Sequence, residues 1–366
     1  MIYFDNASTT AMRPEAVSAM ADAQANLYAN ASSPHSFALK AEKAVRQARQ
    51  IIAQRAGVEP EELYFSPNGT LADCTAVYGA LASCRGGRII TTAFEHPAVL
   101  QCFKKLENKF DVIYIRPGKD GLIHAQDVRE ALTPDTRLVS IMQVNNETGA
   151  ISPLAQIADE IKRSGCGALM HTDAIQGFLK EPFAYKTVDM ASFSAHKTHG
   201  PKGLGALYVR RGLKLRPVYD GGGQEDGLFS GTTNVPAIVA WAESCRLADP
   251  EAERESVSQI SRRLRRGITD LGGRVISPPE ASPYIINAVF EKYLADNIVN
   301  YMSERGIYIS RGSACSSKKP SHVFKALGME QYGKHALRIS LSSANTERQA
   351  EVFLDTLGQA LAELAH

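Results

Sequence analysis

The chain has 366 residues, of which 44% are hydrophobic and 22% are charged, which is typical of a globular protein long enough for more than one domain. Its 41 basic and 39 acidic residues give a formal net charge of +2, which argues against nucleic acid or a membrane surface as partner. No run approaches the roughly 20 consecutive apolar residues of a membrane span, and the first residues do not resemble a signal peptide. We therefore expect a cytoplasmic protein.

Residues 35–56 are predicted to form one long helix, because apolar residues recur there at every third or fourth position. Between about residue 60 and residue 211, short β-rich runs alternate with amphipathic stretches. The apolar runs are residues 63–65, 89–92, 112–115, 138–142, 168–170, 190–193 and 205–209. This alternation predicts an α/β domain with a mostly parallel sheet.

The pattern changes after Trp241. The sequence then predicts a polar helix at residues 251–271 and short apolar runs at 274–276 and 284–290. A second helix at 293–305, a loop at 312–320, a further apolar run at 336–341 and a final helix from 346 onward follow. We expect a large domain over residues 15–245. Residues 1–14 and 246–366 should form a smaller α+β domain that carries the loop at 312–320.

Residues 192–203, Ser-Phe-Ser-Ala-His-Lys-Thr-His-Gly-Pro-Lys-Gly, place a hydroxyl, a histidine and a lysine where a predicted strand ends. A lysine that forms a Schiff base must be held at one point, partly desolvated and near an anchor for phosphate. Lys197 could be that amine, with Ser194 and His196 donating to the phosphate. A solvated basic loop would explain this segment alone equally well.

Asp173 directly follows the apolar run at 168–170. A carboxylate at the carboxyl end of a parallel strand faces the ligand crevice. Pyridoxal 5'-phosphate (PLP) needs an anionic partner for its pyridine nitrogen. Asp173 could be this partner, with Gln176 near the phenolic oxygen of the ring. An aspartate that caps a helix is the alternative.

Three more polar segments, at residues 143–149, 94–97 and 66–70, each follow an apolar run. Asn146 could place an amide against the ligand, although its segment could be only a turn. His96 could stack on a cofactor ring and move protons, although a lone histidine is more often structural. Gly69 and Thr70 stand at a strand-to-helix turn, which suits a phosphate. Because parallel strands end at one edge of a sheet, all these loops predict a common crevice.

Together these segments resemble the class V aminotransferase superfamily and, within it, the cysteine desulfurases. Residues 3–10, 30–35, 221–225 and 312–315 extend the resemblance over nearly the whole chain. The resemblance implies a PLP-dependent transferase of fold type I. Its large domain would contain a mainly parallel mixed sheet flanked by helices, and it would function as a homodimer.

The resemblance also implies a role for each site residue. Lys197 and His96 would be catalytic, and Cys315 would accept the sulfur. The cofactor would be held by Lys197, Asp173, Gln176, Asn146, Gly69, Thr70, Ser194, His196, His96 and, from the second subunit, Thr232. Arg338 would bind the substrate carboxylate, which a guanidinium fork suits, and Asn146 would contact the substrate. No metal is implied.

The implied reaction converts L-cysteine to L-alanine and leaves the sulfur on Cys315 as a persulfide for an acceptor protein of iron–sulfur cluster assembly or thiolation. Residues 312–320, Gly-Ser-Ala-Cys-Ser-Ser-Lys-Lys-Pro, have the small, polar, lysine-flanked character that a mobile thiolate requires. A selenocysteine lyase or another PLP enzyme of the superfamily is an alternative. A scaffold that only binds a sulfur acceptor is a third possibility, against which Lys197, Asp173 and Cys315 argue.

The chain departs from the family pattern at several positions. The acidic residue after Thr70 is displaced to Asp73, and Asp226 and Phe229 stand where relatives have arginine. Arg311 replaces a common serine before the Gly-Ser-Ala-Cys motif. These changes predict a weaker or replaced phosphate contact across the subunits, an extra cation near Cys315 and a specialised subfamily.

Overall fold

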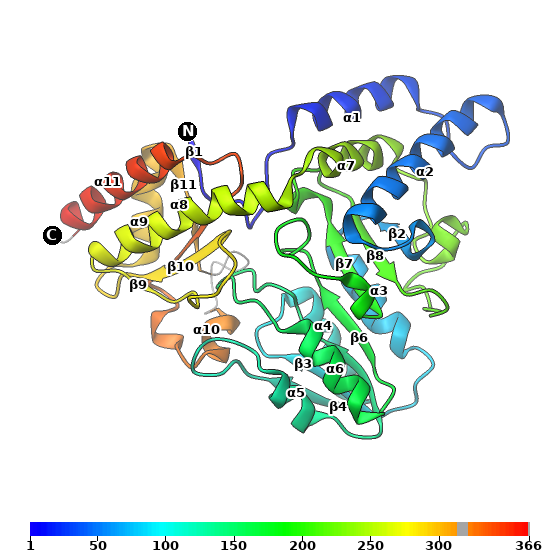
Figure 1. The fold of residues 1–366 in the computed structure, drawn as a ribbon, viewed down its shortest axis with the longest axis horizontal. Helices are drawn as coiled ribbons and strands as arrows, with labels where there is room; N and C mark the ends of the chain where they lie inside the picture. The colour runs from blue at the N-terminus through cyan, green and yellow to red at the C-terminus, as the bar shows by residue number, and fades with distance from the viewer. Residues whose placement is uncertain (313–320, 365–366) are drawn as a thin grey trace.

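The computed structural model describes residues 1–312 and 321–364. Within these ranges the seven predicted apolar runs form one mixed sheet in the order β2-β8-β7-β6-β5-β3-β4 (Figure 1). Its strands are β2 (Leu63–Ser66), β3 (Arg88–Thr92), β4 (Asp111–Ile115), β5 (Thr136–Ser140), β6 (Leu169–Asp173), β7 (Met190–Ser194) and β8 (Gly205–Val209). The strands from β3 to β7 run parallel, whereas β8 is antiparallel to both of its neighbours.

Helices cover both faces of this sheet. Successive strand residues point to opposite faces, so consecutive apolar residues make both faces apolar. Ile89 packs in the hydrophobic cluster of α3 and α4, whereas Ile90 packs in the cluster of α2, α6 and α7. The helices of this part are α1 (Pro14–Asn26), α2 (Ser36–Ala56), α3 (Gly69–Leu81), α4 (Pro97–Leu106), α5 (Ala125–Ala131), α6 (Leu154–Ser164) and α7 (Val235–Leu247). The predicted α/β architecture is therefore confirmed.

A second sheet, in the order β12-β13-β10-β9, forms the C-terminal part with its own buried cluster. Its strands are β9 (Arg274–Val275), β10 (Ile285–Val289), β12 (Ser310–Arg311) and β13 (Ala336–Ser340). The accompanying helices are α8 (Pro250–Asp270), α9 (Ala295–Glu304), α10 (His322–Ala326) and α11 (Glu347–Glu363). In Figure 1, α8 extends along this part from its junction with the larger sheet. The domain boundary near residue 245 stays a prediction.

The N-terminal segment belongs spatially to both parts of the molecule. Strand β1 (Ile2–Tyr3) pairs in parallel with β11 (Ile307–Tyr308), so the N-terminus lies beside the C-terminal helices (Figure 1). The backbone N–H of Thr10 then donates to the His196 carbonyl at 2.9 Å, just past β7. Residues 5–10 therefore run along the junction of the two sheets, where β6 and β7 also end.

Among the described helices, none has both the length and the apolar character required to cross a membrane.

Candidate active site

A cavity of about 350 Å³ opens at the carboxyl ends of the parallel strands, where such sheets bind ligands. Within the described ranges, it is lined by every predicted site residue except Thr232. Strand β6 contributes Asp173, strand β7 contributes Ser194, and the loops after β3 and β5 contribute His96 and Asn146. The predicted convergence of several strand ends on one crevice is therefore observed.

Asp173 and Lys197 lie on neighbouring strand ends and line the same cavity. Asp173 is 3% exposed, and its Oδ1 accepts the Ile175 backbone N–H at 2.9 Å. Burial raises the pKa of Asp173 to about 6, against the lowering effects of the Ile175 N–H and of Lys197. The Lys197 amine donates to the carbonyl oxygens of Ala7 at 2.6 Å and Ser8 at 2.8 Å. The N-terminal segment thus holds the predicted Schiff-base lysine.

The first turn of α3 forms one wall of the cavity. Asn68 caps this helix by accepting the Leu71 N–H at 2.8 Å, and the N–H groups of Gly69 and Thr70 have no hydrogen-bond partner among the described residues. A Cβ on Gly69 would lie 2.4 Å from Ile175 Cδ1 and 3.2 Å from Ser194 Cβ, so a larger residue here would force the Ile175 side chain to shift. Exposed helix N–H donors are suited to an anion.

His196 and Ser194 line the same cavity. The His196 Nδ1 lies 3.1 Å from the Thr9 hydroxyl. Burial, together with the charge of Lys197, lowers the pKa of His196 to about 4. The ring is therefore neutral near pH 7, and it can offer a phosphate a hydrogen bond but no charge.

His96 caps α4, which begins at Pro97, and its Nδ1 accepts the Ala98 N–H at 3.2 Å. Burial, then Lys197 and His322, lower the pKa of His96 to about 4. The neutral ring must carry its proton on Nε2, because Nδ1 acts as an acceptor.

Gln176 and Asn146 both reach the cavity, from different loops. The buried Gln176 amide donates from Nε2 to the Ala7 carbonyl at 2.8 Å. Asn145, rather than Asn146, builds its own turn: its Oδ1 accepts the N–H groups of Glu147 at 3.0 Å and Thr148 at 2.9 Å. Asn145 therefore forms the turn, whereas Asn146 lines the cavity.

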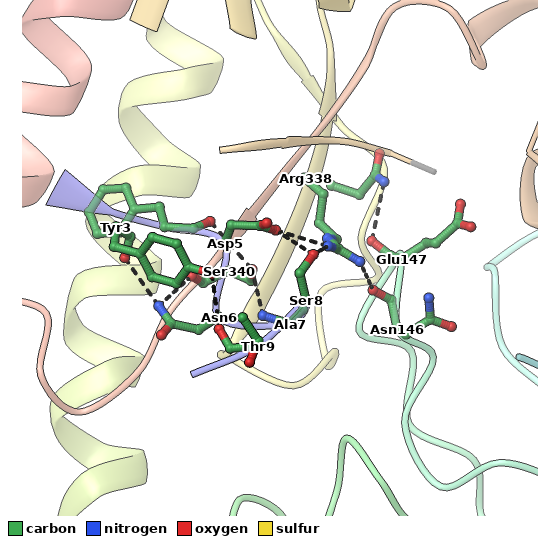
Figure 2. A network of polar contacts seen from close by, with 12 residues as sticks. Tyr3, Asp5, Asn6, Ala7, Ser8, Thr9, Asn146, Glu147, Arg338 and Ser340 are labelled. Atoms are coloured by element: carbon green, nitrogen blue, oxygen red, sulfur yellow. Dashed lines mark hydrogen bonds and ion pairs between the residues drawn. The ribbon is translucent and has the colours of Figure 1, made fainter. Parts of the chain in front are cut away.

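Arg338 enters the cavity from the middle of β13 and is 1% exposed. Figure 2 shows its guanidinium between the N-terminal segment and the Asn146 loop. Its Nη2 donates to Asp5 Oδ1 at 2.9 Å and to the Ser8 hydroxyl at 2.5 Å, and its Nη1 donates to the Asn146 carbonyl at 3.0 Å. The arginine therefore lies where predicted, with partners that the sequence did not indicate.

Among the predicted residues that the structure describes, Thr232 is not brought into this cavity. Thr232 is exposed and lines a separate hollow of about 260 Å³. Cys315 lies outside the described residues. Ser321, where the described chain resumes, is 5% exposed and donates its hydroxyl to Glu147 Oε2 at 2.6 Å. Because Glu147 follows the cavity residue Asn146, the chain after the Cys315 segment is tied next to the cavity.

The structure locates three of the residues that depart from the family pattern. Phe229 is 4% exposed in a hydrophobic cluster, and Asp226 has a φ of 54°, a left-handed conformation. Arg311 pairs with Asp296 of α9 at 3.1 Å, so its added charge is partly neutralised.

Asp73 was noted in the sequence only as a displaced acid. It is fully buried, its Oδ1 lies 3.7 Å from His171 Nε2, and a hydrogen bond with Ser192 acts to lower its pKa. Potential ligand atoms of Asp73, His96 and Asp173 all lie within 4.8 Å of one another. Burial, and next the charge of Asp173, raise the pKa of Asp73 well above its usual value. The sequence shows that Asp73 is an acidic residue in the first turns of a helix beside the cavity. It does not show that this residue lies near His96 and Asp173.

The residues present fit PLP. Unpaired N–H groups at the start of α3 suit its phosphate, the Asp173 carboxylate suits a pyridinium nitrogen, and the Lys197 amine suits its carbonyl carbon.

The aminotransferase class-V family model matches residues 2–353. A cysteine desulfurase of Gluconacetobacter diazotrophicus is 38% identical over 99% of this chain and 94% of that protein. A solved NifS-like protein superposes with a TM-score of 0.93 at 34% identity, covering 99% of both chains. The structure of SspA in complex with cysteine has a TM-score of 0.84 at 35% identity, covering 94% of this chain and 100% of that one. The fold is the expected fold type I, and the chain belongs to the aminotransferase class-V family.

Proposed function

We propose that this protein is a PLP-dependent cysteine desulfurase that forms L-alanine and a persulfide on Cys315. The observation that carries the proposal is the single cavity that contains the Lys197 amine, the Asp173 carboxylate and the Arg338 guanidinium. A relative named cysteine desulfurase, and a related structure that contains cysteine, support the choice of reaction and substrate.

Lys197 would hold the cofactor covalently, and Asp173 would pair with its pyridine nitrogen. Gly69, Thr70, Ser194 and His196 would hold its phosphate. PLP supplies an electron sink that stabilises negative charge at the substrate Cα. The residues of the cavity then need only to orient the substrate and to move protons.

Arg338 binds the substrate carboxylate, since its guanidinium is the cation that β13 contributes to the cavity wall. The Lys197 amine is the better acceptor for the Cα proton, because Nδ1 of His96 is occupied by the Ala98 N–H. His96, with its proton on Nε2, is a donor in this state. The two residues thus divide the tasks of base and acid.

Sulfur transfer requires Cys315 to attack as a thiolate. The C–S bond of the substrate breaks, and its sulfur atom joins the Cys315 sulfur. The electron pair of the broken bond stays with the carbon fragment, which takes up a proton on the way to L-alanine. The Ser321–Glu147 contact supports this role, because it tethers the chain after Cys315 beside the cavity residue Asn146.

The active form is a homodimer in which Thr232 completes the phosphate site of the other subunit. The support is that Thr232 is exposed and does not line its own chain's Lys197 cavity. The persulfide is then passed to a sulfur-acceptor protein, and the reaction is expected in the cytoplasm.

The test is to incubate the purified protein with PLP and L-cysteine, quantify L-alanine and measure the mass of the Cys315 peptide. We expect L-alanine and one added sulfur on Cys315. Cys315→Ser should keep the cofactor absorbance but lose the persulfide, with Cys166→Ser as the control thiol. Sulfide release by Cys315→Ser at the parent rate would contradict the acceptor assignment. A strong preference for selenocysteine would favour the lyase alternative.

A further inference from the structure

Lys180 is a lysine whose side chain is almost completely buried. It is 8% exposed, although lysines are seldom buried without a charged partner. Among the described residues, no carboxylate lies within ion-pair distance of its amine. The amine instead donates to Gln176 Oε1 at 3.5 Å and lies 5.6 Å from the centroid of the Tyr284 ring. A buried cation placed against an amide of the cavity points to a task beyond packing.

The turn after β6 keeps Lys180 in this place at the cost of backbone strain. Leu179, the residue before it, has a φ of 59°, a left-handed conformation that residues other than glycine rarely adopt. The N–H groups of Lys180 and Glu181 both donate to the Gly177 carbonyl, at 2.9 Å and 2.8 Å. Strain of this kind persists where the surroundings over-determine it, and it concentrates at functional sites.

We propose that Lys180 is a positioning residue that fixes the orientation of the Gln176 side-chain amide, so that an N–H group of Gln176 faces the ring oxygen of the cofactor. The inference rests on the proposed function, because it concerns PLP bound in the same cavity. Lys180 itself does not line that cavity, so it acts only through Gln176.

The two neighbours of the Gln176 amide accept only one orientation. An ammonium group only donates hydrogen bonds, and a carbonyl oxygen only accepts them. Protonated Lys180 therefore selects Oε1, while the Ala7 carbonyl selects Nε2 at 2.8 Å. The second N–H of Nε2 is left for a ligand in the cavity that Gln176 lines. A flipped amide would set Oε1 against the Ala7 carbonyl and present an oxygen to the anionic ring oxygen.

The charged groups around Lys180 lie after β7, in the turn that contains Lys180 itself and on α8. Burial, then the neighbouring Lys197, lower the pKa of Lys180 to about 7, whereas Glu181 and Glu253 of α8 act in the opposite direction. Glu181 is itself paired with Arg254 at 3.0 Å. The amide is thus held most firmly on the acidic side of this pKa, where the amine is fully protonated and can only donate.

The experiment is a double-mutant cycle on the full-length protein with PLP, comprising Lys180→Met, Gln176→Leu and the double variant. The readout is the pH midpoint of the visible absorbance of the bound cofactor, together with the dissociation constant for PLP. Hydrogen bonding to an ionised oxygen lowers its pKa. Each single variant should therefore raise the midpoint by roughly one pH unit, and the double variant should match Gln176→Leu. Lys186→Met, an exposed lysine paired with Glu59, is the control.

An unchanged midpoint in Lys180→Met would overturn the inference. A midpoint in the double variant that rises by the sum of the single changes would also overturn it, because Lys180 would then act by its charge alone. A parent protein without visible absorbance would contradict the proposed function instead. Should Lys180→Met fail to fold, nuclear Overhauser effects measured in the parent protein test the orientation of the Gln176 amide. Its amide hydrogens must then lie close to residue 7 and not to the Lys180 side chain.

Discussion

Arg338 and Asp5, which are separated by 333 residues in the sequence, form an ion pair of 2.9 Å inside the candidate active site (Figure 2). The arginine is 1% exposed in its side chain, whereas the aspartate is 22% exposed. A buried guanidinium needs compensating charge, and Asp5 supplies it on one side only. The guanidinium lines the cavity, and its buried Nε has no partner among the described residues, so the donors of Arg338 are only partly satisfied.

Replacing Arg338 with lysine should weaken substrate binding more than turnover. Lysine keeps the positive charge but loses the planar fork that can bind two oxygens at once. A charge-assisted hydrogen bond contributes about 1.5–3 kcal/mol, so KM for L-cysteine should rise about tenfold to a hundredfold. Steady-state kinetics with L-cysteine measure this change. Arg274→Lys, on the exposed edge strand β9, is the matched control, and a normal KM in Arg338→Lys would refute the assignment.

Replacing Lys197 with alanine should abolish the visible absorbance of the bound cofactor together with L-alanine production. The amine is the group on the cavity wall that can bond covalently to a carbonyl carbon, and the Ala7 and Ser8 carbonyls hold it there. Absorbance spectra after addition of PLP and gel filtration test the prediction. Lys202→Ala changes an exposed lysine of the same loop and should leave the spectrum unaltered. An unaltered spectrum in Lys197→Ala would remove Lys197 from its role.

Glu95 should make the protein less stable as the pH rises. Its Oε1 accepts hydrogen bonds from the Thr92 hydroxyl at 2.7 Å and the Met142 N–H at 2.9 Å, while its buried Oε2 has no partner among the described residues. Burial raises the pKa of Glu95 from 4.5 to about 8 despite these donors. The folded protein therefore keeps a proton that the unfolded chain releases, and stability is lost between these two values as pH rises.

Glu95→Gln removes this titration, because an amide of similar shape cannot lose a proton. Between these two pKa values, the free energy of unfolding of the variant minus that of the parent should increase by up to about 1.4 kcal/mol for each pH unit. Urea unfolding at several pH values between those two pKa values provides the measurement, with the exposed Glu280→Gln as control. A difference between variant and parent that stays constant with pH would show that Glu95 is ionised in the folded protein.

The sequence predicted the main sheet and most of the site for physical reasons that are visible in individual residues. Asp173 and Ser194 could be found because each ends a buried strand, and the ends of parallel strands must meet. Lys180 could not be found, because it stands in a short irregular segment between two strands, where no periodic pattern indicates which side chains are buried. Its burial depends on the Leu179 backbone and on Gln176. The Asp5–Arg338 pair depends on how the N-terminal segment crosses between the sheets, and no local pattern specifies that path.

Ser321→Ala should destabilise the protein and slow sulfur transfer while leaving cofactor binding intact. The Ser321 hydroxyl donates to Glu147 at 2.6 Å and also caps α10 by accepting the Val323 and Phe324 N–H groups. A buried carboxylate that loses its donor costs about 1–3 kcal/mol, and a lost cap costs about 1 kcal/mol more. Urea unfolding measures the first effect, and the rate of sulfur addition to Cys315 measures the second.

Glu147→Gln separates these two contributions, because it leaves the cap in place and still offers an oxygen to Ser321. Burial raises the pKa of Glu147 to about 7, against the lowering effects of Ser321 and Arg338. The neutral amide should therefore be tolerated best above that value, where the parent must ionise a buried carboxyl group. If Ser321→Ala forms the persulfide as fast as Glu147→Gln and the parent do, the contact stabilises the fold but does not position the segment that carries Cys315.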